Sequence, residues 1–207
     1  NHSHLEDYIK SSNLTQNYRN VFEAINDFEK HIAFDKGSFV FHRNWGVGLI
    51  RKLDKDTLTI NFGRTGGIHE ISLKMAVSAL KPLSEDHIWV LKATKKPDEL
   101  AALIKNDKKW ALKTIIQSFD NNCDFKRIKA ELVPVILKPT EWTSWNTAAK
   151  KILESDAEFG VNPNDINCYT VRDHEITQEE KLSNEFKAQK QFFARVEILM
   201  KFFYSDM

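Results

Sequence analysis

The stretch Val40-Phe41-His42-Arg43-Asn44-Trp45-Gly46-Val47-Gly48-Leu49-Ile50 decides the fold of the region around it. It is typical of two short strands joined by a turn, with apolar residues on both sides of two closely spaced glycines. Such glycines indicate a turn or bulge in which the backbone needs a positive φ angle or a close approach. We therefore expect Gly46, Gly48 and His42 to build this turn, with the His42 ring bonded to backbone groups.

Alternation of apolar and polar residues, which is typical of strands, continues on the C-terminal side of this stretch. Residues 57–62 alternate apolar and polar side chains, as a half-buried strand does, and residues 63–67 are rich in glycine, as a loop is. The predicted strands cover residues 38–42, 48–53, 57–62, 68–73 and 78–83. Five short antiparallel strands in about fifty residues predict a small SH3-like or Tudor-like β-barrel.

Helical periodicity flanks this predicted barrel on both sides. Residues 14–34 carry apolar side chains at spacings of three and four, which predicts an amphipathic helix packed on the barrel. After Pro82 several helices follow, and their predicted caps or first-turn residues are Ser84, Pro97, either Asn106 or Asp107, and Asp124. A longer helix then starts at 140–141, and 159–171 predicts a β-hairpin. Helices followed by a hairpin are the order of a winged helix.

The predicted fold class is therefore α+β, with a small barrel, a winged-helix-like helical domain and flanking amphipathic helices. The C-terminal helix, at 176–204, is apolar on more than one face, so it needs a partner, and we expect it to continue beyond the sequence. The predicted divisions are an N-terminal helix at 1–33, the barrel at 34–83, the winged-helix-like domain at 84–174 and the C-terminal helix at 175–207.

The first predicted domain resembles a known family. The spacing Gly37-x-x-Val40-x-His42-x-x-x-Gly46-Val47-Gly48-x-Ile50 resembles the opening of the CarD-type domain, which also forms the polymerase-interacting module of the transcription-repair coupling factor. The run Ala79-Leu80-Lys81-Pro82-Leu83 stands where that family has a closing strand. The resemblance implies a Tudor-like barrel that binds RNA polymerase through its β subunit.

A second resemblance lies in the helical part. The pattern Trp142-x-x-Trp145-x-x-x-Ala149-x-Lys151-x-Leu153-x-x-Asp156-x-x-Phe159-Gly160, followed by Tyr169-x-x-Arg172, is similar to a segment in the long N-terminal extensions of some Gre-type transcript cleavage factors. Together the two resemblances imply the N-terminal part of a bacterial transcription elongation factor.

The sequence carries no recognisable catalytic or metal-binding constellation. None of its seven histidines has a Cys, Asp or second His at ligand spacing, and Cys123 and Cys168 form no spaced pair. Residues 63–67 lack the Gly-Lys-Ser/Thr of a phosphate-binding loop. We expect a protein without enzymatic activity, metal or cofactor. The lack of a long apolar run or signal peptide predicts a cytoplasmic protein that does not contact membranes.

Residues for partner binding are predicted in the loops of the barrel. Arg43 and Trp45 lie in the first turn and Arg64 lies in the glycine-rich loop, and both residue types are enriched at interface hot spots. Core packing explains Trp45 equally well. Residues 34–83 carry eight Lys/Arg and four Asp/Glu, and this modest surplus also fits an ordinary solvated surface.

The alternative function is binding of double-stranded DNA by the barrel and the winged helix. Trp142 and Trp145 share one helical face and are predicted to be core residues, while the opposite face carries Thr, Asn and Lys. Residues 84–174 carry fourteen Lys/Arg and fourteen Asp/Glu, and this balance favours protein contact over DNA contact. A third possibility is a helical assembly scaffold. The DNA-contacting residues predicted under this alternative are Arg127, Lys129, Lys138, Lys150 and Lys151.

Overall fold

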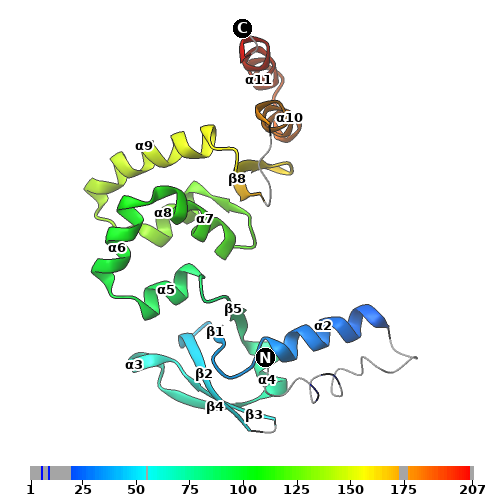
Figure 1. The fold of residues 1–207 in the computed structure, drawn as a ribbon, viewed down its shortest axis with the longest axis vertical. Coiled ribbons are helices and arrows are strands. Elements are labelled where there is room, and N and C mark those ends of the chain that lie inside the picture. The colour runs from blue at the N-terminus through cyan, green and yellow to red at the C-terminus, as the bar shows by residue number, and fades with distance from the viewer. Residues whose placement is uncertain (1–5, 7–8, 10–19, 55, 173–176, 206–207) are drawn as a thin grey trace. The chain divides into compact units, whose positions relative to one another are not determined.

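The structure, a computed structural model, describes residues 6, 9, 20–54, 56–172 and 177–205 (Figure 1). It divides into two compact units, Asn1–Glu85 and Asp86–Met207. Helices and antiparallel strands occur in both units, so the α+β class is confirmed. No helix among the described residues has both the length and the apolar character needed to cross a membrane.

The first unit is built on one antiparallel sheet. Its strands are β1 (Phe39–His42), β2 (Gly46–Asp54), β3 (Thr57–Asn61), β4 (Ile68–Ser72) and β5 (Lys81–Leu83), and its helices are α2 (Val21–Ile32), α3 (Gly63–Gly66) and α4 (Leu73–Ala79). The strand order is β4-β3-β2-β1-β5. Within the described ranges no pairing joins the outer strands β4 and β5, so the sheet is open and a closed barrel is not confirmed.

The core of this unit lies on one face of the sheet. Val40, Ile50, Leu58 and Ile60 are fully buried there, because alternate residues of a strand point to the same side. Ala76 of α4 is buried in the same cluster. This arrangement agrees with the alternation predicted for the third strand.

Several predicted boundaries in this unit were wrong. The first turn occupies residues 43–45, while Gly46 and Gly48 lie inside β2, with Gly46 paired to His42. Helix α4 replaces the first part of the predicted fifth strand, and α3 occupies the predicted loop. Within the described residues α2 begins at Val21, and the predicted start at residue 14 lies outside them.

Helix α2 packs less closely than predicted. It contacts α4, and its Ala24 is buried. Phe22 and Val21, however, are 83 % and 64 % exposed. The amphipathic helix is thus confirmed, but part of its apolar face is open to solvent.

The second unit contains the winged-helix-like region. Its elements are α5 (Ile88–Thr94), α6 (Pro97–Asn106), α7 (Lys108–Ser118), β6 (Cys123–Asp124), α8 (Phe125–Leu132), α9 (Pro139–Ser155), β7 (Phe159–Asn162), β8 (Asp165–Val171), α10 (Gln178–Ala188) and α11 (Phe192–Ser205). The run α7-β6-α8-α9-β7-β8, with sheet order β6-β8-β7, is a winged-helix arrangement. Strand β6 was missed because two residues carry no periodicity.

Local capping fixes the helices of this region much as predicted. The carboxylates of Asp107 and Asp124 accept hydrogen bonds from the backbone N–H groups of Trp110 (2.8 Å) and Arg127 (2.7 Å). Helix α5 starts at Ile88 and is capped by His87, not by Ser84 as predicted. Trp145 of α9 is buried, and its Nε1–H donates to the Ile104 carbonyl at 3.0 Å.

The C-terminal segment forms two helices instead of the single one predicted. Helix α10 packs on β7, and α11 packs on α10. The buried Lys181 of α10 donates from Nζ to the carbonyl oxygens of Leu153 (2.9 Å), Glu154 and Asp156 (3.2 Å). These bonds satisfy the last carbonyls of α9 and attach α10 to the winged-helix-like region.

Candidate functional site

A stack of three aromatic rings stands at the first turn of the N-terminal sheet. The Trp45 indole lies between the imidazoles of His42 and His69, with ring centroids 4.0 Å and 3.7 Å away and interplanar angles of 26° and 14°. Phe62 approaches the same indole at 5.3 Å. Trp45 is half-buried, and because both faces of its indole pack on imidazole rings, neither face is available to a partner.

The His42 ring also holds the turn itself. Its Nδ1 accepts hydrogen bonds from the backbone N–H groups of Asn44 and Trp45, both at 3.3 Å. On the other side of the stack, Nε2 of His69 lies 2.7 Å from the Gly66 carbonyl oxygen. His69 was missed by sequence reasoning, because only the folded sheet brings β4 beside the turn.

The two glycines of β2 have different roles. Gly46 has a φ angle of +76°, which favours glycine, and a Cβ atom there would meet nothing within 4 Å. Gly48 has no positive φ, but a Cβ there would lie 2.6 Å from the Phe62 ring. Gly48 therefore provides room for the ring that supports Trp45.

Arg43 and Arg64 are the exposed cations near this stack. Arg43 lies in the turn that contains Trp45, and Arg64 lies in α3, just before Gly66 and His69. Ile68, the first residue of the outer strand β4, is 69 % exposed. The three predicted partner-binding residues thus converge on one region of the first unit, with Trp45 as a packed support and the arginines accessible.

The second candidate site lies on α8 and α9, where Arg127 is exposed but also makes contacts within the unit. The Arg127 guanidinium lies over the Phe119 ring, 4.0 Å from its centroid, and its Nε contacts Glu131 at 3.2 Å. Glu131 is buried and also accepts hydrogen bonds from Trp89 Nε1 (3.0 Å) and Lys92 Nζ (2.6 Å). This cluster ties α5 to α8 and engages Nε of Arg127, whose side chain is 44 % exposed.

The other four predicted nucleic-acid residues and one neighbouring lysine differ from Arg127 because they form no ion pair with any described residue. All five side chains are exposed, and no ion pair within 4.0 Å involves any of them in the part of the chain that the structure describes. They lie on α8, on α9 and at the residue that precedes α9. We call these residues the lysine face: Lys126, Lys129, Lys138, Lys150 and Lys151.

The acidic residues of this region are mostly engaged elsewhere. Glu141 pairs with Lys105 at 2.8 Å, and Asp156 pairs with Lys109 at 2.7 Å. The hydrogen bond from Lys105 lowers the pKa of Glu141. Although Lys/Arg and Asp/Glu balance in number, the lysine face therefore carries five exposed lysines without an ion pair among the described residues, which net charge alone could not reveal.

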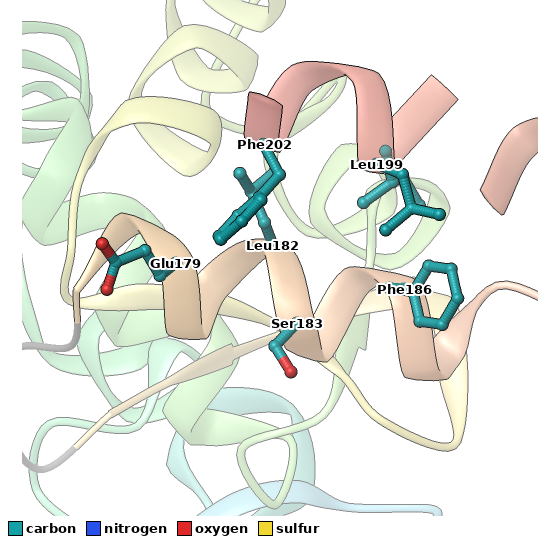
Figure 2. A pocket seen from close by; sticks show the side chains of 7 residues that line it. Glu179, Leu182, Ser183, Phe186, Leu199 and Phe202 are labelled. Atoms are coloured by element: carbon teal, nitrogen blue, oxygen red, sulfur yellow. The ribbon is translucent and has the colours of Figure 1, made fainter. Parts of the chain in front are cut away.

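An open apolar pocket lies between α10 and α11, which also pack on each other (Figure 2). Figure 2 shows Leu182 and Phe186 of α10 opposite Leu199 and Phe202 of α11. The space that they line has a volume of about 240 Å³. The outer surface of α11 is also apolar, with Phe193 79 % exposed. Packing of α11 on α10 therefore covers only part of its apolar surface.

The element order and sheet of the second unit are those of a helix-turn-helix domain of the winged type. Residues 89–176 match the family model of the GRAD helix-turn-helix domain. The match covers α6 to β8 completely and supports the Gre-associated, winged-helix-like region inferred from the tryptophan pattern.

Whole-sequence relatives point in the same direction. The chain is 58 % identical to a GreA-associated domains protein of Treponema pallidum over 97 % of its length, and 38 % identical to transcription elongation factor GreA of Borreliella burgdorferi over 96 %. A Chlamydia trachomatis transcription elongation factor GreA is 27 % identical over 60 % of the chain. The chain spans 30 %, 22 % and 18 % of these proteins. No solved structure matches it significantly.

Proposed function

We propose that the chain is the non-enzymatic, polymerase-docking part of a bacterial transcription elongation factor. Similarity to proteins named transcription elongation factor GreA supports the elongation role. The resemblance of the first unit to CarD-type domains supports RNA polymerase, through its β subunit, as the partner, and a Tudor-like barrel as its fold. A cytoplasmic location accompanies this proposal.

The observation that carries the docking proposal is the pair of exposed arginines beside a rigid aromatic stack. Arg43 and Arg64 can supply hot-spot contacts, while Trp45 holds the turn in one shape. The outer strand β4 has an unpaired edge among the described residues and an exposed Ile68, which suits addition of a strand from the partner. Docking then raises the local concentration of the attached polypeptide at the polymerase.

A pull-down of bacterial RNA polymerase with the full chain tests this proposal. Arg43→Glu and Arg64→Glu should each reduce retention by about tenfold, as loss of a hot-spot contact does. Lys74→Glu, on the exposed surface of α4, is the matched control and should retain polymerase like the parent chain. Failure of the parent chain to retain polymerase would sink the proposal.

The second candidate function is nucleic-acid binding by the helix-turn-helix unit. The family match and the lysine face favour it, since exposed lysines without carboxylate partners attract phosphate groups. Of the residues predicted from the sequence, we propose Lys129, Lys138, Lys150 and Lys151 as contacts. Arg127 is engaged with Phe119 and Glu131 instead. Measurable binding to duplex or single-stranded nucleic acid at low salt, declining as salt rises, is the expected result.

A further inference from the structure

Two lysine–aromatic contacts join α8 to α9. The Nζ atom of Lys129 on α8 lies 6.0 Å from the ring centroid of Trp142 on α9. Reciprocally, Nζ of Lys150 on α9 lies 5.4 Å from the ring centroid of Phe125 on α8. Both lysines are exposed and both rings are partly exposed. The lysine face therefore contains aromatic surface as well as charge.

The core of the unit holds both rings in place. Trp142 stacks on the buried Trp145, with centroids 5.5 Å apart and an interplanar angle of 22°. Phe125 meets the ring of Tyr169 edge to face, with centroids 5.5 Å apart. Rings supported in this way need no ordering when a ligand stacks on them, whereas the lysine side chains can move.

From this arrangement we propose that the face formed by α8 and α9 binds single-stranded nucleic acid. Bases stack on Trp142 and Phe125, the Lys129 and Lys150 ammonium groups move from the rings to phosphates, and the remaining lysines track the backbone. Stacking a base on an aromatic ring is stronger than an exposed cation–π contact, so this exchange is favourable. The proposal rests on the second candidate function and specifies its ligand.

The same surface fits a duplex less well. Bases inside a duplex are stacked on each other and cannot present their faces to Trp142 or Phe125. The turn of the wing, Asn162-Pro163-Asn164-Asp165, carries no cation for a second backbone contact.

Fluorescence anisotropy with the full chain tests the proposal. The probes are labelled oligo(U) RNA and oligo(dT) DNA of about 12 nucleotides, a length within the site sizes usual for single-strand binders. A labelled duplex of the same length is the comparison. At about 50 mM salt, either single strand should bind at least about tenfold more tightly than the duplex. Tighter binding of the RNA assigns RNA as ligand, tighter binding of the DNA assigns DNA, and both results support the proposal.

Variants separate the aromatic and the charged contributions. The double change Lys129→Ala and Lys150→Ala should weaken single-strand binding by about tenfold, and Trp142→Leu by a similar factor. Lys95→Ala, an exposed lysine outside this face, is the matched control. Because Trp142→Leu also alters packing on Trp145, its thermal transition is measured beside that of the lysine variant, which leaves the core intact.

Three results would overturn the proposal, and they can be told apart. If the duplex binds as tightly as the single strands or more tightly, the single-strand inference fails and the nucleic-acid function stands. If neither form binds at low salt, both fail. Equal binding by the Lys129→Ala, Lys150→Ala variant and the parent chain would also overturn the placement of the site on α8 and α9.

Discussion

The rings of Trp45 and His69 are nearly parallel, 14° apart, with their centroids 3.7 Å from each other. This contact joins the turn between β1 and β2 to strand β4, which β3 separates from β2 in the sheet. Trp45→Ala should therefore destabilise the first unit by about 2–4 kcal/mol, through lost burial and lost stacking. Denaturant unfolding of the full chain measures this, with Arg43→Glu as a control that should change stability by less than about 0.5 kcal/mol.

The glycines of β2 offer a direct comparison of steric clash and backbone strain. Gly48→Ala places a Cβ 2.6 Å from the Phe62 ring and 2.8 Å from Ile60, and should cost about 2–3 kcal/mol. Gly46→Ala has free space but a φ of +76°, and should cost about 1 kcal/mol. Equal unfolding midpoints for the two variants would contradict these separate roles.

Glu131 should be more important for stability than the surface carboxylates. Glu131→Gln weakens three contacts, to Trp89, Lys92 and Arg127, and we expect a loss of about 2 kcal/mol. Glu99→Gln removes an exposed pair with Lys96 and should be nearly neutral, within about 0.5 kcal/mol. Chemical denaturation of both variants gives the comparison, and a neutral Glu131→Gln would refute the structural role.

Lys181 should control the attachment of the C-terminal helices. Lys181→Met leaves the carbonyl groups of Leu153, Glu154 and Asp156 without this donor, at a cost of about 2 kcal/mol. Because α11 packs on α10, both helices should lose protection together. Amide hydrogen exchange should rise across residues 178–205 while the centre of α7 stays protected. Unchanged exchange in α10 would argue against this attachment.

The ion pair of Asp156 predicts a pH dependence. Burial works against its charged form, but hydrogen bonds from the Lys109 ammonium and the Glu158 backbone N–H outweigh burial, and the pKa of Asp156 is lowered. A carboxyl with a lowered folded-state pKa contributes stability above its unfolded pKa of about 3.9 and loses it as the pH falls through the folded value. The stability difference between the parent chain and Asp156→Asn should thus shrink from about pH 5 towards about pH 2. A constant difference would contradict the prediction.

Local signals in the sequence were reliable where the physical cause is local. Asp107 and Asp124 cap helices through bonds to residues three positions away, and Pro97 opens α6 as expected. The alternation of the third strand likewise predicted β3. The predicted boundaries near α4 were wrong because the apolar residues of 73–79 fit the spacing of a helix as well as that of a strand. Packing against the sheet then selects the helix.

Contacts between distant residues could not be predicted. Glu131 and Trp89 are 42 positions apart, so the engagement of Arg127 depends on how α5 packs against α8. The balanced charge count of the second unit could not show where lysines without ion pairs lie, because a count contains no positions. The assignment of the lysines of α9 to nucleic-acid contact therefore stays a prediction, and the net charge used to weigh it contains no information on position.

The position of Trp45 has a practical consequence. The chain has five tryptophans, and Trp45 is the one that precedes residue 86; the others are Trp89, Trp110, Trp142 and Trp145. An indole stacked between two imidazoles is an intrinsic optical probe whose emission changes when either ring leaves it. The difference spectrum between the parent chain and Trp45→Phe therefore reports on the first unit alone, so that its unfolding and its engagement by a partner can be followed without an attached dye.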